Sequence, residues 1–183
     1  MKKVCVFLAD GFEEIEGLTV VDVLRRAGVE TETVSVMGRK QISGAHGIGI
    51  KADCVFEDAE AEKADMLVLP GGMPGTLHLK EHRELGELLK RFDREEKYIA
   101  AICAAPTVLG GLGILKGRKA CCYPSCEADL DCAEASEDPV VTDGHITTSR
   151  GMGTAIPFAL KLTALLCGEE KAEEIAKSIV YQA

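Results

Sequence analysis

Residues 3–36, KVCVFLADGFEEIEGLTVVDVLRRAGVETETVSV, decide the fold because they combine two strand patterns with one helix pattern. Residues 3–8 form a nearly continuous apolar run, which is typical of a strand buried on both faces of a parallel sheet. In residues 16–27, Leu18, Val21 and Leu24 recur at helical spacing, and Gly28 suits the position just after a helix. Residues 29–36 alternate apolar and polar side chains, as in a half-buried strand. The chain therefore opens as β-α-β.

The alternation of strand and helix continues further along the chain. Residues 64–69 and 98–102 are two more short apolar runs. Between them, one face of a helix is marked at i, i+3, i+4 and i+7 by Leu85, Leu88, Leu89 and Phe92. Strands that alternate with helices predict an α/β fold whose mostly parallel sheet is covered on both faces.

The last third of the chain predicts a hairpin followed by two helices. Residues 140–142 and 145–148 flank Asp143-Gly144, a dipeptide typical of a two-residue turn. Helices are expected at 153–167 and 169–181, and the first is apolar almost all round, which predicts deep burial or a subunit interface. Residues 125–139 carry six acidic residues and no Lys or Arg. We interpret them as a solvated loop in preference to an acidic docking site.

Length and composition restrict the class of protein. A chain of 183 residues predicts one domain, 1–183, which can bury enough surface to fold without disulfides or metal. The net charge of −9 and the 4% of aromatic residues argue against a nucleic-acid partner. The most apolar stretch, 154–167, is shorter than a membrane span, and no export signal precedes residue 10. We therefore expect a soluble, cytoplasmic protein that makes no membrane contact and keeps its eight cysteines reduced.

Cys103 has the setting of a nucleophile. It follows the predicted strand 98–102 and precedes Pro106, which suits the first turn of a helix. A residue at such a turn projects from the carboxyl edge of the sheet, where open α/β proteins bind ligands. The start of the following helix favours the thiolate over the thiol. The alternative is a buried structural cysteine.

Two further loops are predicted at the same edge. Gly71 and Gly72 follow the strand 64–69, and paired glycines let backbone amides approach a ligand and form half of an oxyanion hole. The alternative is an ordinary glycine-rich turn. Residues 9–16 contain Glu13, Glu14 and Glu16 close to the start of the first helix. Most acids in this position remain solvated, but one of them could point at Cys103.

The motifs ADGFEEIE, VLPGG, AAICAAP and TTSRGMGT, in this order, resemble the ThiJ/PfpI superfamily, in the branch of the Parkinson-disease deglycase and the bacterial ThiJ-like proteins. The resemblance implies a flavodoxin-like three-layer α/β/α sandwich, similar to class I glutamine amidotransferases, and a homodimer. It implies that Cys103 is the nucleophile and that Glu16 is the acid beside it. It also implies that Gly72 and Ala104 supply amides to the oxyanion site, in a loop shaped by Gly71.

The function implied by the resemblance is a cysteine-dependent glyoxalase or deglycase. It would convert small α-oxoaldehydes, methylglyoxal or glyoxal, to 2-hydroxy acids without glutathione, metal or cofactor. A thiolate and a protonated carboxyl can stabilise each other, and the same acid can move protons on the substrate. The alternative is an oxidative-stress sensor or redox-regulated chaperone that acts through oxidation of Cys103. A role beside thiamine synthesis is a weaker alternative, suggested by the superfamily name alone.

Two departures from the family pattern remove a histidine base. Ala104 stands where the protease branch has His, and Tyr123 stands where members of the closer branch have His. The pattern therefore predicts a Cys-Glu dyad in place of a triad. His46, Tyr123 and Arg150 are possible substrate-binding residues, and the amides of 148–151 with the Arg150 guanidinium could hold an anion. The alternatives are an exposed loop histidine and a structural arginine.

Two other patterns could indicate a metal. His78 and His82 fit H-x-x-E-H, but the helical phase of the following residues predicts a helix starting near Glu81, with His78 in the loop before it. Four cysteines fall within twelve residues, at 121, 122, 126 and 132, yet their spacing is unlike common zinc sites. Adjacent Cys121 and Cys122 point to opposite faces of a strand. We expect reduced thiols and no metal.

Overall fold

The computed structural model describes residues 2–182. The strands are β1 (Lys3–Leu8), β2 (Glu30–Ser35), β3 (Gln41–Ser43), β4 (Gly49–Lys51), β5 (Cys54–Val55), β6 (Met66–Leu69), β7 (Tyr98–Ile102), β8 (Lys119–Ala120), β9 (Glu134–Ala135), β10 (Val140–Asp143) and β11 (Ile146–Ser149). The α-helices are α1 (Glu14–Arg26), α2 (Gly75–Glu81), α3 (Arg83–Arg94), α4 (Pro106–Gly111), α5 (Ala155–Cys167) and α6 (Glu169–Ser178).

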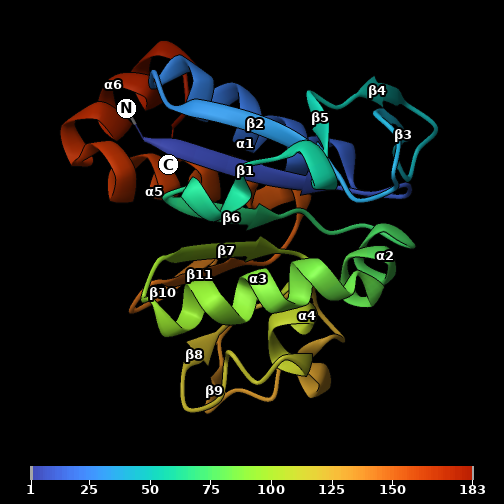
Figure 1. Cartoon of the computed structure of the whole chain (residues 1–183). Helices are drawn as coiled ribbons and strands as arrows, with labels where there is room; N and C mark the ends of the chain where they lie inside the picture. Colours follow the sequence, from blue (N-terminus) through green and yellow to red (C-terminus); the bar gives the residue numbers. More distant parts are fainter. Residues whose placement is uncertain (1, 183) are drawn as a thin grey trace.

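Seven strands form one sheet in the order β10-β11-β7-β6-β1-β2-β5. All neighbours in it are parallel except β10, which runs antiparallel to β11. The inner order β2-β1-β6-β7-β11 corresponds to 2-1-3-4-5, the order of flavodoxin-like sheets. The predicted α/β class and the flavodoxin-like architecture are therefore confirmed, as Figure 1 shows.

The helices cover both faces of this sheet, and β1 shows why. Its side chains alternate between two cores, so that Cys5 and Phe7 pack on the side of α2, α3 and α4. Val4, Val6 and Leu8 pack on the side of α1, α5 and α6. A strand buried on both faces needs apolar residues at every position, which the run at 3–8 supplies. The helix layers lie on opposite sides of the strands in Figure 1.

Several predicted boundaries and exposures are wrong. Helix α1 begins at Glu14, two residues earlier than expected, and Leu18 is 37% exposed although its spacing placed it on the buried face. The hairpin turn is Gly144-His145, because Asp143 pairs with Ile146 and so belongs to the strand. Strand β2 is buried on both faces in its second half, because it lies inside the sheet between β1 and β5.

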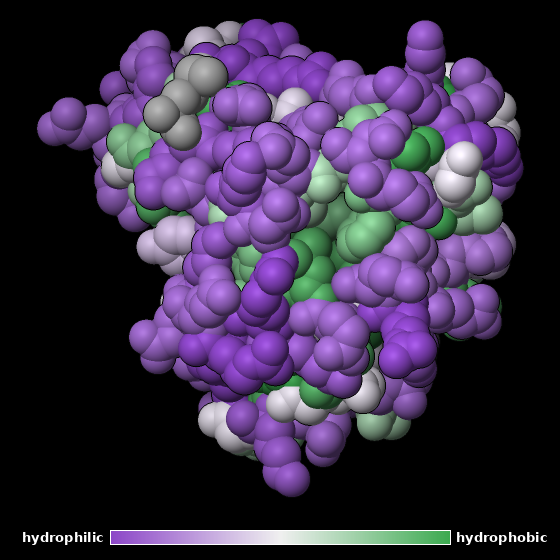
Figure 2. Space-filling model, in the orientation of Figure 1, coloured by the Kyte–Doolittle hydropathy of each residue, from purple (hydrophilic) through white to green (hydrophobic). Residues whose placement is uncertain are grey.

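The remaining segments follow the expectations more closely. Helix α5 buries Phe158, Ala159 and Leu162 against the sheet, in agreement with its apolar sequence. The acidic stretch is mostly loop, with a 3-10 turn at Glu127–Asp129 and the short strand β9. No helix within residues 2–182 has both the length and the apolar character needed to cross a bilayer. The face shown in Figure 2 is mostly hydrophilic, and hydrophobic residues show in a hollow near its centre.

Candidate active site

Cys103 lies in the turn between β7 and α4, at the carboxyl edge of the sheet. Its φ is 65°, which is uncommon for a residue with a side chain and costs on the order of 1–3 kcal/mol. Two backbone hydrogen bonds hold this conformation. The amide of Cys103 donates to the carbonyl of Ser149 at 3.0 Å, and its carbonyl accepts the amide of Tyr123 at 2.8 Å. The predicted strand-turn-helix setting of Cys103 is present.

Glu16 reaches Cys103 from the first turn of α1. Its carboxyl is 1% exposed, and Oε2 accepts the amide of Gly71 at 2.9 Å. The carboxyl lies close to Cys103, because Glu16 Oε2 and Cys103 Cβ both border the space beside Gly71, and the two groups shift each other's pKa. Glu13 caps the helix, because its Oε2 accepts the amide of Glu16 at 2.8 Å. The acid that the resemblance assigned to Cys103 therefore lies beside it.

The loop after β6 packs against both groups. A Cβ on Gly71 would lie 2.6 Å from Cys103 Cβ and 2.8 Å from Glu16 Oε2, so a side chain here would force the neighbouring groups to shift. Gly72 has a φ of 91°, in the region that favours glycine. The amides of Gly72 and Ala104 both act to lower the pKa of the Cys103 thiol. The three residues named for the oxyanion site and its loop thus lie close to one thiol.

The charges of Glu16 and Cys103 depend on each other. Burial raises the pKa of Glu16 to about 7, although hydrogen bonds from Cys103 and Gly71 oppose this rise. Burial and the Glu16 carboxylate raise the pKa of Cys103 to about 12, against the amides of Ala104 and Gly72. The amide of Ala104, at the helix start, does lower the thiol pKa as expected, but burial outweighs it. The pair carries one negative charge above neutral pH, and that charge lies on sulfur when Glu16 keeps the proton.

Tyr123 borders the site from the segment after β8. A Cβ on Gly151 would lie 3.5 Å from the Tyr123 ring and 4.0 Å from Glu16 Oε1, so Gly151 separates the two side chains. The ring is 51% exposed and forms part of a pocket wall. Tyr123 therefore lies near Glu16, with Gly151 close to both side chains.

Arg150 does not form the predicted anion cradle. The amides of Arg150 and Gly151 both donate to Thr154 Oγ1, at 3.2 and 3.1 Å, so they are not free for a ligand. The Arg150 guanidinium donates through Nη1 to the carbonyl of Glu137 at 3.2 Å. This bond ties the acidic stretch to the loop before α5. The two amides are therefore occupied, whereas Arg150 Nε is buried without a hydrogen-bond partner.

His46 pairs with Glu14. Its backbone amide and its Nδ1 bond to the two oxygens of Glu14, both at 2.8 Å, while the ring remains largely exposed. Burial would raise the pKa of Glu14, but these bonds hold it below the ordinary value, and Glu14 in turn raises the pKa of His46. Glu14 is 2% exposed, although most acids in this position remain solvated. No local signal could reveal this, because His46 is 32 residues away.

One group within residues 2–182 has metal-ligand types close together. Atoms of Glu13, Glu14 and His46 lie within 4.8 Å of one another. The bonds between Glu14 and His46 and the helix cap made by Glu13 already account for this arrangement. We assign no ion to it.

The structure also bears on the H-x-x-E-H pattern and on the cysteines at 121–132. His78 lies in α2, contrary to the expected loop, and His82 lies between α2 and α3, where its Nδ1 accepts the amide of Leu85 at 3.1 Å. The two histidines therefore do not share one unbroken helix. None of the eight cysteines forms a disulfide, and the amide of Cys121 donates to Thr148 Oγ1.

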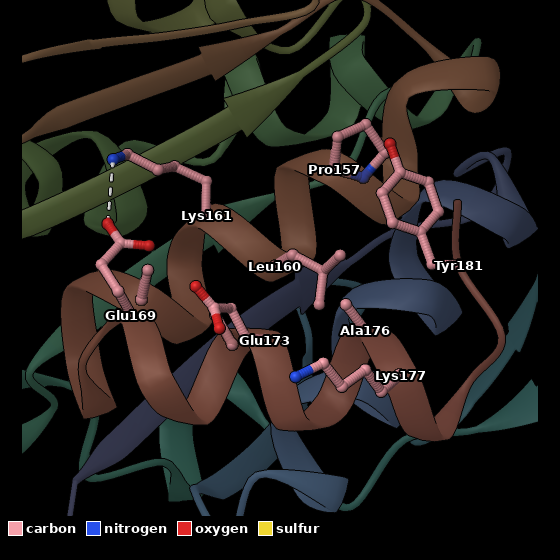
Figure 3. A pocket seen from close by; sticks show the side chains of 10 residues that line it. Pro157, Leu160, Lys161, Glu169, Glu173, Ala176, Lys177 and Tyr181 are labelled. Carbon is pink, nitrogen blue, oxygen red and sulfur yellow. Dashed lines mark ion pairs between the residues drawn. The ribbon is translucent and has the colours of Figure 1, made fainter. Parts of the chain in front are cut away.

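A separate apolar pocket lies between α5 and α6, away from these residues. Its volume is about 560 Å³, and Figure 3 shows Leu160 and Ala176 facing each other across it. Lys161 and Glu169 form an ion pair of 3.9 Å at its rim. None of the residues assigned to the candidate site lines it.

Comparison with known proteins gives the family. The model described as "DJ-1/PfpI family" matches residues 2–165. The chain belongs to the DJ-1/PfpI family. The resemblance drawn from the four motifs is therefore confirmed, and the whole chain shares the fold of this family.

Its relatives include proteins of a plant, an insect and a nematode. "Protein dj-1beta" of Drosophila melanogaster is 38% identical over 98% of this chain and 97% of its own length. "Protein DJ-1 homolog B" of Arabidopsis thaliana is 40% identical, but the chain spans only 42% of that protein. "Glutathione-independent glyoxalase DJR-1.2" of Caenorhabditis elegans is 35% identical over 91% of this chain and 89% of its own length. The solved structure "Toxoplasma gondii DJ-1, oxidized" has a TM-score of 0.96, with 38% identity and full coverage of both chains.

Proposed function

We propose that this chain is a cysteine-dependent, glutathione-independent glyoxalase that converts methylglyoxal and glyoxal to 2-hydroxy acids. The proposal rests on the placement of Cys103 beside a buried carboxyl and two backbone amides. The name of the nematode relative, a glutathione-independent glyoxalase, supports the same reaction. The dyad supplies a nucleophile and a proton carrier from one pair of side chains.

The first step is addition of the Cys103 thiolate to the aldehyde carbon. The carbon-sulfur bond forms while the carbonyl π electrons move to oxygen, which gives a hemithioacetal oxyanion. The amides of Gly72 and Ala104 lie beside the sulfur and can donate to this oxygen. Glu16, which holds the shared proton when the thiolate forms, then gives that proton to the oxyanion.

The second step moves a proton from C1 to C2. The Glu16 carboxylate takes the proton on C1, which produces an enediolate with its charge on the C2 oxygen. The proton of the C1 hydroxyl passes to the C2 oxygen, and Glu16 returns its own proton to C2, which gives a thioester of the 2-hydroxy acid. Water hydrolyses the thioester, which frees the thiol and the acid. The overall reaction adds one water and needs no external oxidant or reductant. A carboxyl with a pKa of about 7 can both accept and donate protons near neutrality. The same addition to early glycation adducts would give deglycase activity.

Lactate formation from methylglyoxal tests the proposal. The purified protein is incubated with methylglyoxal and a strong chelator, with and without glutathione, and lactate is measured by NMR. We expect lactate at the same rate in both reactions. Absence of lactate, or lactate formed only after glutathione is added, would contradict the proposal.

Oxidation of Cys103 is a second candidate function, favoured by a relative whose solved structure is described as oxidized. A thiolate attacks peroxide to give sulfenic acid and water, and a second peroxide gives sulfinic acid. Glu16 and the two amides can hydrogen-bond to the sulfinate oxygens. After mild peroxide treatment, peptide mass spectrometry should find oxidation concentrated at Cys103. Oxidation spread evenly over all eight cysteines would contradict a dedicated sensor.

We also propose that the chain forms a homodimer. Apolar side chains of Ile15 and Leu18 are exposed on α1, and Ile156 is exposed on α5, which packs against α1. Exposed apolar residues on packed neighbouring helices are typical of an interface. Light scattering should give twice the chain mass, and substitution of Ile15 and Leu18 by Ser should shift it to the monomer mass.

A further inference from the structure

A second pocket is lined in part by Gly151, which lies close to Glu16 of the Cys103-Glu16 dyad. Its volume is about 480 Å³, and its apolar wall is made by Tyr123, Pro124, Pro139 and Met152. These residues come from the segment after β8, the end of the acidic stretch and the loop before α5. We call it the Tyr123-Met152 pocket.

The pocket and the dyad share a boundary at Gly151. This glycine lines the pocket, and a Cβ on it would lie 4.0 Å from Glu16 Oε1 and 3.5 Å from the Tyr123 ring. The backbone also connects them, because the amide of Tyr123 donates to the carbonyl of Cys103 at 2.8 Å. A molecule bound covalently to Cys103 therefore has this pocket within its reach.

The pocket wall is mostly apolar, although the charged side chains of Glu137 and Arg150 also line it and Arg150 Nε has no hydrogen-bond partner. The hydroxyl of Thr154 is already occupied by the amides of Arg150 and Gly151, and Arg150 Nη1 donates to the carbonyl of Glu137. Tyr123 and Met152, in contrast, are 51% and 57% exposed, so apolar surface remains uncovered there. An aromatic ring beside a methionine sulfur is a favourable surface for another ring.

The size of the pocket fits a ring. A protein cavity of about 150 Å³ is enough to hold benzene. The Tyr123-Met152 pocket is about 480 Å³, so a phenyl group has room without movement of the walls. Methylglyoxal places only a methyl group beyond its dicarbonyl unit, and glyoxal places only a hydrogen, so neither fills this space.

We propose that the Tyr123-Met152 pocket binds the substituent on the ketone carbon of an α-oxoaldehyde, and that the favoured substrates are arylglyoxals. This inference rests on the proposed glyoxalase function. It makes Tyr123 and Met152 determinants of specificity. Tyr123 then forms an aromatic wall of the pocket and does not act as a catalytic base. Phenylglyoxal, which would be converted to mandelate, is the simplest substrate of this class.

The ratio of kcat/KM for phenylglyoxal to kcat/KM for glyoxal tests the inference. In the unsubstituted protein we expect phenylglyoxal to be favoured at least about tenfold, because filling an apolar pocket contributes on that order. Met152→Ser and Tyr123→Ala should each lower the ratio roughly tenfold, mainly through a higher KM for phenylglyoxal. Tyr123→Phe should keep the ratio, because it keeps the ring and removes only the hydroxyl.

Leu77→Ser is the matched control, since Leu77 is a similarly exposed apolar residue on α2 that does not line the pocket. Its ratio should equal that of the unsubstituted protein. A ratio that Met152→Ser and Tyr123→Ala leave unchanged would overturn the inference, and so would an equal loss for both substrates. A ratio lowered by Tyr123→Phe would overturn the assignment of Tyr123 as a wall.

A binding measurement separates this inference from the proposed function. Acetophenone carries the phenyl ketone but no aldehyde, so it probes the pocket without reaction. Saturation-transfer NMR should detect acetophenone on the Cys103→Ser protein and should lose the signal when Met152→Ser is added. If no aldehyde is turned over while acetophenone binding depends on Met152, the glyoxalase proposal fails and the pocket assignment stands. If an aldehyde is turned over but acetophenone binding does not depend on Met152, the pocket assignment fails and the glyoxalase proposal stands.

Discussion

Cys103 and Cys121 are two thiols of the same chain with contrasting neighbours. Both contact the carboxyl end of β11: the amide of Cys103 donates to the Ser149 carbonyl, and that of Cys121 donates to Thr148 Oγ1. Burial raises the pKa of both thiols. Cys121 has the Thr148 hydroxyl at 3.6 Å from its sulfur. Cys103 has a buried carboxyl and two backbone amides.

The contrast shows that burial alone does not make a reactive cysteine. A buried thiol without a proton partner remains neutral and inert. At Cys103 the carboxyl of Glu16 can keep the proton, and the amides of Gly72 and Ala104 can stabilise the charge on sulfur. The following substitutions test whether these neighbours distinguish the two thiols.

The largest effect on the rate should come from removal of the Cys103 thiol, and removal of the Cys121 thiol should have almost none. Cys103→Ser should lower the rate of methylglyoxal consumption by at least about 10³-fold, because the nucleophile is lost. Cys121→Ser should keep the rate within about twofold, since a hydroxyl can replace the thiol beside Thr148. Initial rates of the two variants, at equal folded fraction by circular dichroism, measure the difference. Equal losses would remove the basis of the comparison.

Loss of the proton carrier, Glu16, should have the second-largest effect on turnover. Glu16→Gln keeps the bond to the Gly71 amide but cannot accept a substrate proton, so we expect kcat to fall by roughly 10²–10⁴-fold. Thr148→Val, which alters the neighbour of Cys121, is the matched control and should leave kcat near its original value. The steady-state kcat of both variants decides the point, and a Glu16→Gln protein of undiminished kcat would exclude Glu16 as the carrier.

The raised pKa of Glu16 also predicts a dependence of stability on pH. Its ordinary pKa of 4.5 rises to about 7 in the folded protein, so the folded state binds the proton more tightly. This contribution to stability is present below pH 4.5 and is lost as the pH rises through about 7. Between pH 5 and pH 8 the original protein should lose roughly 2–3 kcal/mol that Glu16→Gln does not lose. Urea unfolding at the two pH values measures this, and parallel changes in both proteins would contradict the raised pKa.

The glycine packed against Cys103 should give the smallest effect. Gly71→Ala brings a Cβ to 2.6 Å from Cys103 Cβ and 2.9 Å from the Ile102 carbonyl, so we expect about 1–3 kcal/mol of destabilisation. Gly153→Ala is the control, because no atom lies within 4 Å of its added Cβ. Thermal unfolding should separate the two variants. If both unfold at the original temperature, the close packing around Cys103 is not as described.

The sequence predicted the fold well because its strands are buried on both faces. Lys3–Leu8 and Tyr98–Ile102 match their predicted bounds, since a short apolar run without alternation is typical of a central strand in a parallel sheet. The exposure of Leu18 was not predictable, because helical spacing does not specify how wide a stripe the sheet covers. The hairpin turn was displaced by one residue because cross-strand pairing includes Asp143.

The site was predictable in its residues but less so in its electrostatics. Cys103, Glu16, Gly71 and Gly72 meet because the carboxyl ends of parallel strands share one edge. The burial of Glu14 and its pairing with His46 depend on a distant loop, and the occupied amides of Arg150 and Gly151 depend on Thr154. The pKa directions needed the depth of burial, which no motif specifies.

The pH dependence of Cys103 alkylation tests most directly whether Glu16 sets the reactivity of this thiol. Iodoacetamide labelling, measured by peptide mass spectrometry, is compared in the original protein and in Glu16→Gln. Because the pair releases its first proton near pH 7, the labelling rate of Cys103 should rise with an apparent pKa of about 7, while Cys121 stays unlabelled in the folded protein. In Glu16→Gln the rise near pH 7 should disappear. An identical pH profile in both proteins, or equal labelling of Cys103 and Cys121, would contradict the account.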